Sequence, residues 1–148
     1  MSLRERIQED MKVAMRAREA ERLGTIRMLL AAVKQREIDE RRVLEEGEVL
    51  SLVDKLIKQR KDSASQFSAG GRPDLAEKEE AEIAILSDYL PDPLAPEAID
   101  ALIGEALIAV GATSPRDMGK VLSALRPQMQ GRADMALVAD QVKARLNP

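Results

Sequence analysis

The chain of 148 residues contains no cysteine, histidine or tryptophan, and its aromatic side chains are one phenylalanine and one tyrosine. Without cysteine it has no disulfide, no thiolate nucleophile and no thiolate ligand for zinc. Without histidine it has no imidazole to act as a general base or a metal ligand. These absences exclude most familiar catalytic and metal-binding arrangements.

The scarcity of aromatic residues leaves Leu, Ile, Val, Met and Ala to build the core, and such a composition favours closely packed helices. The chain is 45% hydrophobic and 33% charged, which provides enough apolar surface for folding. We therefore predict an all-α fold, with an amino-terminal bundle of helical hairpins followed by a small three-helix carboxy-terminal domain.

Long hydrophobic runs are absent as well. No stretch approaches the roughly 20 apolar residues that span a bilayer. The first residues, MSLRERIQEDMK, carry charges every few positions and lack the apolar segment of a signal peptide. We expect a cytoplasmic location and no membrane partner.

Three of the seven prolines, Pro91, Pro93 and Pro96, fall close together. A proline inside a helix removes a backbone hydrogen bond and clashes with the preceding turn. This cluster therefore predicts a domain boundary, with an amino-terminal α-helical domain over residues 1–92 and the three-helix domain over residues 93–148.

Glycine and proline also mark the expected ends of individual helices. A glycine inside a helix costs about 1 kcal/mol relative to alanine, so we expect breaks at Gly24 and Gly47. Pro127 is expected to interrupt a helix near the carboxy terminus. The apolar patterns place Ile38 and Leu137 among the residues that face the core.

Positive charge gathers late in this acidic chain. Residues 116–148 hold six basic and three acidic side chains, a net charge of +3, whereas the whole chain carries −3. A basic face attracts phosphates, and a glycine lets the backbone approach them closely. The candidate phosphate contacts are Lys120, Arg126, Arg132 and Lys143, with Gly119 and Gly131 as points of backbone approach or turning.

The same residues have a structural interpretation. Basic side chains on a small helical bundle often form a solvated face that maintains solubility, and charge alone favours this interpretation. Tight helix packing accounts for Gly119 equally well, and a simple turn accounts for Gly131.

Other candidate sites are weaker. Glu79, Glu80 and Glu82 are near the start of an expected helix, where carboxylates stabilise the helix dipole, so we expect no metal site. Phe67 and Tyr89 are too few and too far apart in the sequence for a platform on which bases stack. No cofactor is expected.

The segment DMGKVLSALRPQMQGRADMALVADQVKARL resembles the tail signature of the GatB/YqeY family. The segments LGTIRMLLAAVKQREI, LIKQRKDSASQF and DLAEKEEAEIAILSDYLP resemble the amino-terminal half of its stand-alone YqeY-like members. The resemblance covers nearly the whole chain. Gln130 departs from it, because the family pattern has a lysine before this glycine, and one phosphate partner is thereby removed.

Within the family, this tail is similar to the carboxy-terminal domain of the GatB subunit of the tRNA-dependent amidotransferase, where it helps to hold tRNA. That enzyme amidates mischarged Glu-tRNA(Gln) or Asp-tRNA(Asn) with glutamine as nitrogen donor. The resemblance implies a tRNA-binding or amidotransferase-related accessory module linked to carbon–nitrogen ligase activity. Its implied partner is tRNA or an aminoacyl-tRNA/amidotransferase complex.

The resemblance supplies no active site, because the kinase-like and amidase portions of the amidotransferase are absent from this chain. Two other functions are left open. The protein could itself be an enzyme, which without Cys or His would rely on Ser, Lys or carboxylates, although no catalytic residue is identified. It could also be a helical protein–protein interaction module without nucleic-acid binding.

Overall fold

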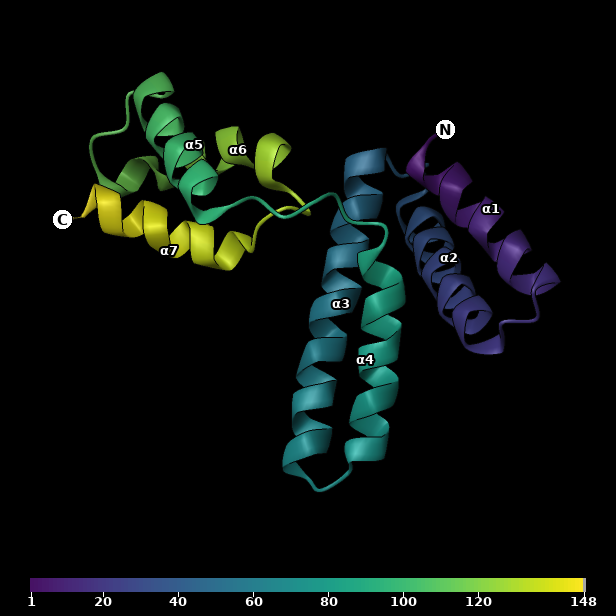
Figure 1. Cartoon of the computed structure of the whole chain (residues 1–148). Coiled ribbons are helices and arrows are strands. Elements are labelled where there is room, and N and C mark those ends of the chain that lie inside the picture. Colours follow the sequence, from purple (N-terminus) through teal and green to yellow (C-terminus); the bar gives the residue numbers. More distant parts are fainter. Residues whose placement is uncertain (148) are drawn as a thin grey trace. The chain divides into compact units, whose positions relative to one another are not determined.

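The computed structural model describes residues 1–147, and this part of the chain is helical without any strand (Figure 1). The prediction of an all-α fold is therefore confirmed. A short 3-10 turn, Pro115–Asp117, precedes the sixth helix. The helices of the described part are α1 (Leu3–Arg16), α2 (Ala20–Glu40), α3 (Glu46–Ala69), α4 (Pro73–Ser87), α5 (Pro96–Ala109), α6 (Met118–Met129) and α7 (Met135–Leu146).

Contacts between residues divide the chain into two compact units. The N-terminal unit runs from Met1 to Leu90 and contains α1 to α4, and the C-terminal unit starts at Pro91 and contains α5 to α7. Each unit has its own cluster of buried hydrophobic side chains. Each unit therefore has the core that an independently folding domain requires.

The N-terminal unit consists of two helical hairpins, α1–α2 and α3–α4, and α4 runs alongside α3 (Figure 1). All four helices contribute to one core. Its most buried side chains, each at most 1% exposed, include Ile7 from α1, Ile26 and Leu29 from α2, Val53 from α3 and Leu86 from α4. Burial of these apolar side chains holds the two hairpins together.

The predicted break at Gly24 is wrong, because α2 begins at Ala20 and continues through this glycine. The chain turns earlier, at Arg18, whose φ of 56° is left-handed. The cost of one exposed helical glycine is about 1 kcal/mol. Burying Ile26 and Leu29 on the core face of the same helix outweighs that cost.

The predicted break at Gly47 is also displaced. The left-handed residue lies at Arg41, with φ 55°, and α3 begins at Glu46, so that Gly47 falls in its first turn. Glu45 and Glu48 form a reciprocal capping box at this start. Such a box satisfies backbone N–H groups that have no helical acceptor, and it therefore sets the helix start ahead of the glycine.

The C-terminal unit packs α5, α6 and α7 around fully buried side chains. These 0%-exposed residues are Ile103 on α5, Val121, Leu125 and Met129 on α6, and Val142 on α7. The three residues of α6 are spaced four apart, so one helical face supplies them all.

Pro127 does not interrupt α6, which extends to Met129. Proline removes only one backbone hydrogen bond here, and its ring lies on the exposed side of the helix. The core face of α6 includes Met129, at 0% exposure. Burial of Met129 requires the helix to continue past the proline.

Two residues expected in the core are exposed. Ile38 is 60% exposed near the end of α2, and Leu137 is 59% exposed on α7. Leu137 precedes Val138, which is buried, and adjacent helical residues point about 100° apart. The core side of α7 is therefore set by Val138 and Val142.

Candidate nucleic-acid interface

Three of the four predicted phosphate contacts are exposed side chains on helices of the C-terminal unit. Lys120 and Arg126 project from α6, and Lys143 projects from α7. Lys120 and Arg126 are six residues apart, so they leave the helix at directions about 120° apart. In the described part of the chain, the side chains of Arg126 and Lys143 have no hydrogen bond or ion pair.

The fourth predicted contact, Arg132, has a structural role in the connection between α6 and α7. Its Nε donates a hydrogen bond to the carbonyl oxygen of Asp92 at 2.9 Å. Its own carbonyl oxygen accepts one from the backbone N–H of Leu94 at 2.8 Å. Arg132 therefore holds the segment before α5 against this turn, and it is not equivalent to the exposed cations of α6 and α7.

The two glycines of the tail occupy different kinds of position. Gly131 has φ 77°, a left-handed conformation that glycine adopts without strain, so its place in the turn accounts for it. Gly119 is exposed in the first turn of α6, and a Cβ added there would meet no atom within 4 Å. Helix packing therefore does not explain Gly119, and there is open space beside its Cα.

A carboxylate caps the 3-10 turn that precedes α6. Asp117 Oδ2 accepts hydrogen bonds from the backbone N–H groups of Thr113 at 2.9 Å and Ser114 at 3.3 Å. These two hydrogen bonds, of which the one from Thr113 has the larger effect, hold the pKa of Asp117 below its usual value. The positive charge of Lys120 lowers this pKa as well. The charge of ionised Asp117 offsets part of the charge of Lys120.

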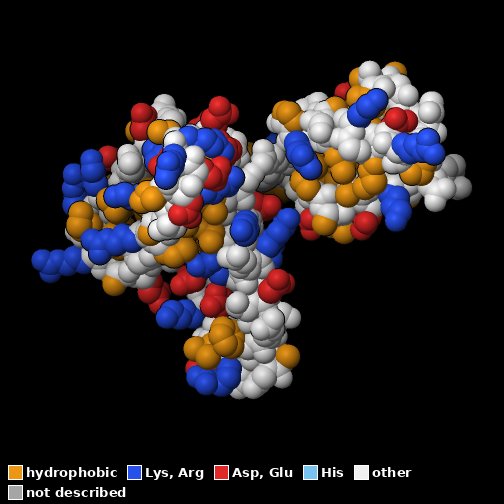
Figure 2. Space-filling view, turned by 180° about the vertical axis from the view of Figure 1, so that it is seen from behind, with side chains coloured by type: hydrophobic (Ala, Val, Ile, Leu, Met, Phe, Trp, Pro, Cys, Tyr) orange, Lys and Arg blue, Asp and Glu red, His pale blue; other side chains and the backbone are white. Residues whose placement is uncertain are grey.

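The C-terminal unit as a whole is not basic. Residues 91–148 hold six basic and seven acidic side chains, because acidic residues before position 116 offset the positive tail. The guanidinium of Arg145 donates hydrogen bonds to the carboxylate and to the backbone carbonyl oxygen of Asp100. Figure 2 shows Lys and Arg side chains at separate places around an apolar area of this unit, at the right of the view. Any phosphate contacts of this unit are therefore made by separate cations and not by one continuous basic surface.

The acidic stretch of α4 takes part in an ion pair. Glu82 accepts a hydrogen bond from Arg60 Nε of α3 at 2.9 Å. Among residues 1–147, no group of three or more acidic side chains is placed to hold a metal ion.

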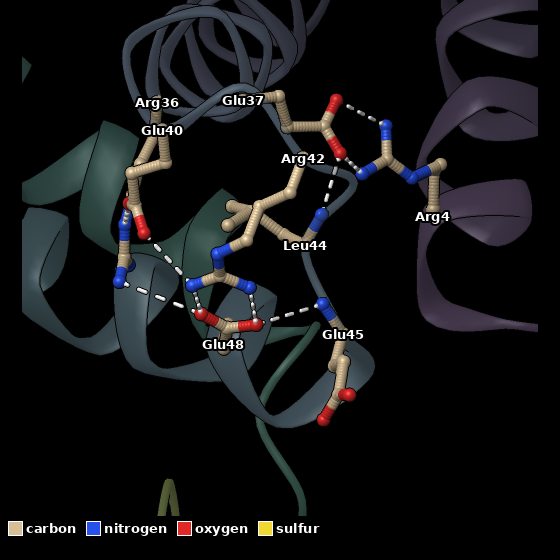
Figure 3. Close-up of polar contacts among 8 residues, drawn as sticks. All are labelled: Arg4, Arg36, Glu37, Glu40, Arg42, Leu44, Glu45 and Glu48. Atoms are coloured by element: carbon tan, nitrogen blue, oxygen red, sulfur yellow. Dashed lines mark hydrogen bonds and ion pairs between the residues drawn. The ribbon is translucent and has the colours of Figure 1, made fainter.

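A polar network that the sequence did not predict joins α1, α2 and the start of α3 (Figure 3). Glu37 on α2 accepts hydrogen bonds from the guanidinium of Arg4 on α1 and, at 2.8 Å, from the backbone N–H of Leu44. The bond from Arg4 is the main reason that the pKa of Glu37 is lowered. Glu37 therefore stays ionised and fixes the chain after α2 against α1.

Glu48 completes this network on α3. Its carboxylate accepts hydrogen bonds from both terminal nitrogens of Arg42 and, at 3.1 Å, from the backbone N–H of Glu45 (Figure 3). The hydrogen bonds from Arg42, then that from Glu45, lower the pKa of Glu48 to about 2. A general acid or base needs a pKa near the working pH. These carboxylates are thus structural, and the contact of Glu37 with Arg4 joins residues too distant in sequence for periodicity to reveal.

The fold defines an all-α protein with two separately packed helical units. Its particular family follows from the sequence as a whole, because the family model described as "Yqey-like protein" matches residues 4–146. The chain belongs to this YqeY-like family, and the resemblance identified from its motifs is confirmed.

The curated relatives named "Altered inheritance of mitochondria protein 41, mitochondrial" include fungal proteins of moderate identity. The one from Lachancea thermotolerans is 42% identical over 112 residues, which cover 74% of this chain and 60% of the relative. The one from Kluyveromyces lactis is 35% identical over 141 residues, which cover 93% and 72%. The one from Pyrenophora tritici-repentis is 32% identical over 130 residues, which cover 86% and 71%. The chain thus spans 60% of the length of the first relative.

The expected cytoplasmic location is contradicted by these relatives, whose names include the word mitochondrial. The lack of a secretory signal pattern concerns only the secretory route and does not distinguish the cytoplasm from mitochondria. Over residues 1–147, no helix is both long enough and apolar enough to cross a membrane.

Proposed function

We propose that this YqeY-like protein binds the phosphate backbone of tRNA through its C-terminal unit and acts as an accessory module in glutamine-dependent amidation of charged tRNA. The relation of its tail to the tRNA-holding domain of the amidotransferase GatB subunit supports the link to carbon–nitrogen ligase chemistry. The bound partner is tRNA alone or tRNA within an amidotransferase complex. No catalytic group is assigned to this chain.

The open space beside the Cα of Gly119 carries this proposal. A helical glycine lowers helix stability, and no neighbouring atom requires the small residue here. The N-terminal end of a helix attracts phosphate, and Lys120 lies next to Gly119 while Arg126 lies two turns further on the same side as the glycine. Contacts of this kind position a nucleic acid without reading its bases.

The proposal predicts salt-sensitive binding that depends on exposed cations of α6. Each neutralised phosphate contributes about −0.9 to the slope of log affinity against log salt concentration on the duplex scale. Replacing Lys120 and Arg126 together by alanine is expected to make the slope shallower by about 2 and to weaken binding of different tRNAs alike. Fluorescence anisotropy with labelled tRNA over a salt series measures both quantities.

The matched control is Lys55→Ala with Lys61→Ala, which removes two exposed lysines from α3 of the N-terminal unit. Both double variants lose the same formal charge, so a general effect of net charge would change them equally. An unchanged slope in the α6 variant would contradict the proposed interface. Failure of the unmodified protein to bind tRNA even at low salt would favour a protein–protein interaction module instead.

Gly119→Ala is expected to separate stability from binding. Alanine has room at this position and is the better helix former, so the free energy of unfolding should rise by about 0.4–1 kcal/mol. If phosphate approaches this backbone closely, the added methyl group should weaken tRNA binding. Thermal unfolding and anisotropy measure the two effects, and a stabilised variant with unchanged affinity would remove the role of Gly119 in binding.

A further inference from the structure

A long segment of the N-terminal unit is more positively charged than the carboxy-terminal tail. Residues 12–34 hold six basic side chains and two acidic ones, a net charge of +4 over 23 residues. This segment includes the end of α1 and most of α2. Figure 2 shows Lys and Arg side chains gathered over this hairpin, at the left of the view.

A groove of about 450 Å³ runs between α1 and α2 on this hairpin. Lys12 of α1 and Lys34 of α2 both line it, so the two helices contribute one ammonium group each. Met11 and Leu30 are half-buried there, whereas Lys12, Lys34 and Gln8 are exposed. The residues lining this α1–α2 groove are Arg4, Gln8, Met11, Lys12, Leu30, Lys34 and Glu37.

The charge of the groove remains positive after its one carboxylate is counted. Glu37 is paired with Arg4 and also accepts the backbone N–H of Leu44. In the part of the chain that the structure describes, the side chains of Lys12 and Lys34 have no hydrogen bond or ion pair. The two lysines therefore give the groove two uncompensated charges, and the Gln8 side chain adds an amide donor.

Further cations extend this surface toward the turn between the two helices. Arg16 is exposed one turn beyond Lys12 on α1. Arg27 is exposed on α2, with its Nη2 at 3.9 Å from the sulfur of Met15 on α1. A row of cations along two helices matches a linear polyanion better than a single small anion.

We propose that the α1–α2 groove binds the phosphodiester backbone of RNA, with Lys12 and Lys34 contacting phosphates from opposite sides. This inference deepens the proposed tRNA-binding function and rests on it, but it assigns a separate surface in the other unit. The occupant is RNA because the apolar residues of the groove lie half-buried between the lysines. An anionic lipid surface is bound through apolar side chains that project with the cations, and Val13 and Met15 of α1 are about half exposed, so vesicles are included in the test.

The test uses a double variant of the full chain that carries both Lys12→Gln and Lys34→Gln. Its binding of labelled tRNA is compared with that of the unmodified protein. Loss of two phosphate contacts is expected to make the salt slope shallower by about 2. Between about 50 and 200 mM salt, the unmodified protein should then lose roughly tenfold more affinity than the variant. Both lysines are exposed, so helicity by circular dichroism should be unchanged.

Two matched variants isolate the groove. Lys55→Gln with Lys61→Gln removes the same charge from α3 and should leave the slope nearly unchanged. Lys12→Arg with Lys34→Arg retains the charge and should restore the slope. A slope that is unchanged in the groove variant, or reduced equally in the α3 variant, would overturn the proposal.

The α6 variant, Lys120→Ala with Arg126→Ala, is measured in the same series and distinguishes the two interfaces. If the salt slope is reduced only in the groove variant, the result supports RNA binding in the groove and rejects the α6 interface. If the slope is reduced only in the α6 variant, the proposal for the groove is overturned. Vesicles of equal parts phosphatidylcholine and phosphatidylserine test the lipid alternative. Loss of vesicle binding by the groove variant, with tRNA binding intact, would also overturn the proposal.

Discussion

Leu125→Ala is expected to unfold the C-terminal unit while the N-terminal unit stays folded. Leu125 is 0% exposed at the centre of the C-terminal core. Truncating a buried leucine removes apolar contacts and leaves a cavity, which costs about 2–5 kcal/mol. A helical unit of this size has little more stability than that, so the loss is expected to abolish most of its protection.

Hydrogen exchange measured by mass spectrometry checks this expectation. Peptides from α5 to α7 should exchange rapidly in the variant, and peptides from α2 and α3 should keep their protection. Leu29→Ala is the matched control, because Leu29 is also 0% exposed but belongs to the N-terminal core. In Leu29→Ala, peptides of the N-terminal unit should exchange rapidly and those of the C-terminal unit should stay protected. If either variant increased exchange equally in both units, the two units would not fold independently.

Tyr89→Ala is expected to destabilise the N-terminal unit by about 3–5 kcal/mol, the usual cost of truncating a buried aromatic side chain. Tyr89 is 3% exposed just after α4, and its hydroxyl donates a hydrogen bond to Asp10 Oδ2 of α1 at 2.7 Å. The guanidinium of Arg6 lies over its ring, 5.0 Å from the centroid. The side chain thus ties the end of α4 to α1.

Tyr89→Phe separates the hydroxyl from the ring. It should cost about 1.5–3 kcal/mol, the range for a hydrogen bond to a charged group, and urea unfolding followed by circular dichroism measures both variants. Equal losses for Tyr89→Phe and Tyr89→Ala would mean that packing of the ring contributes nothing. A loss below the error of the measurement for both would contradict the anchoring role.

The same side chain predicts a dependence on alkaline pH. Burial, then the hydrogen bond to Asp10, raises the pKa of Tyr89 above its ordinary value of 10.0. The unfolded chain therefore loses this proton at a lower pH than the folded chain does, and stability falls as the pH rises above about 10. Below that pH the contribution is complete. Tyr89→Phe should lack this fall, and because Tyr89 is the sole tyrosine, phenolate absorbance reports its ionisation directly.

Parts of the candidate interface could be predicted from the sequence, and parts could not. That Lys120, Arg126 and Lys143 are exposed could be expected from their charge, because unpaired Lys and Arg side chains are rarely buried. The roles of Gly119 and Arg132 could not be expected, because one depends on empty space around a helix and the other on a hydrogen bond to Asp92, 40 residues away in sequence. The α1–α2 groove could not be predicted either, because only the packing of α1 against α2 brings Lys12 and Lys34 to one surface.

The all-α fold and the YqeY-like family follow from the order of the residues alone, because helical periodicity and ordered motifs are properties of residues close together along the chain. The continuation of α2 through Gly24 and of α6 through Pro127 depends instead on tertiary packing. At those positions, burial against distant side chains outweighs a local helix penalty of about 1–3 kcal/mol. Packing of α1 against α2 likewise brings Lys12 and Lys34 to one groove and Arg4 to Glu37, since these partners are more than 20 residues apart and no local pattern relates them.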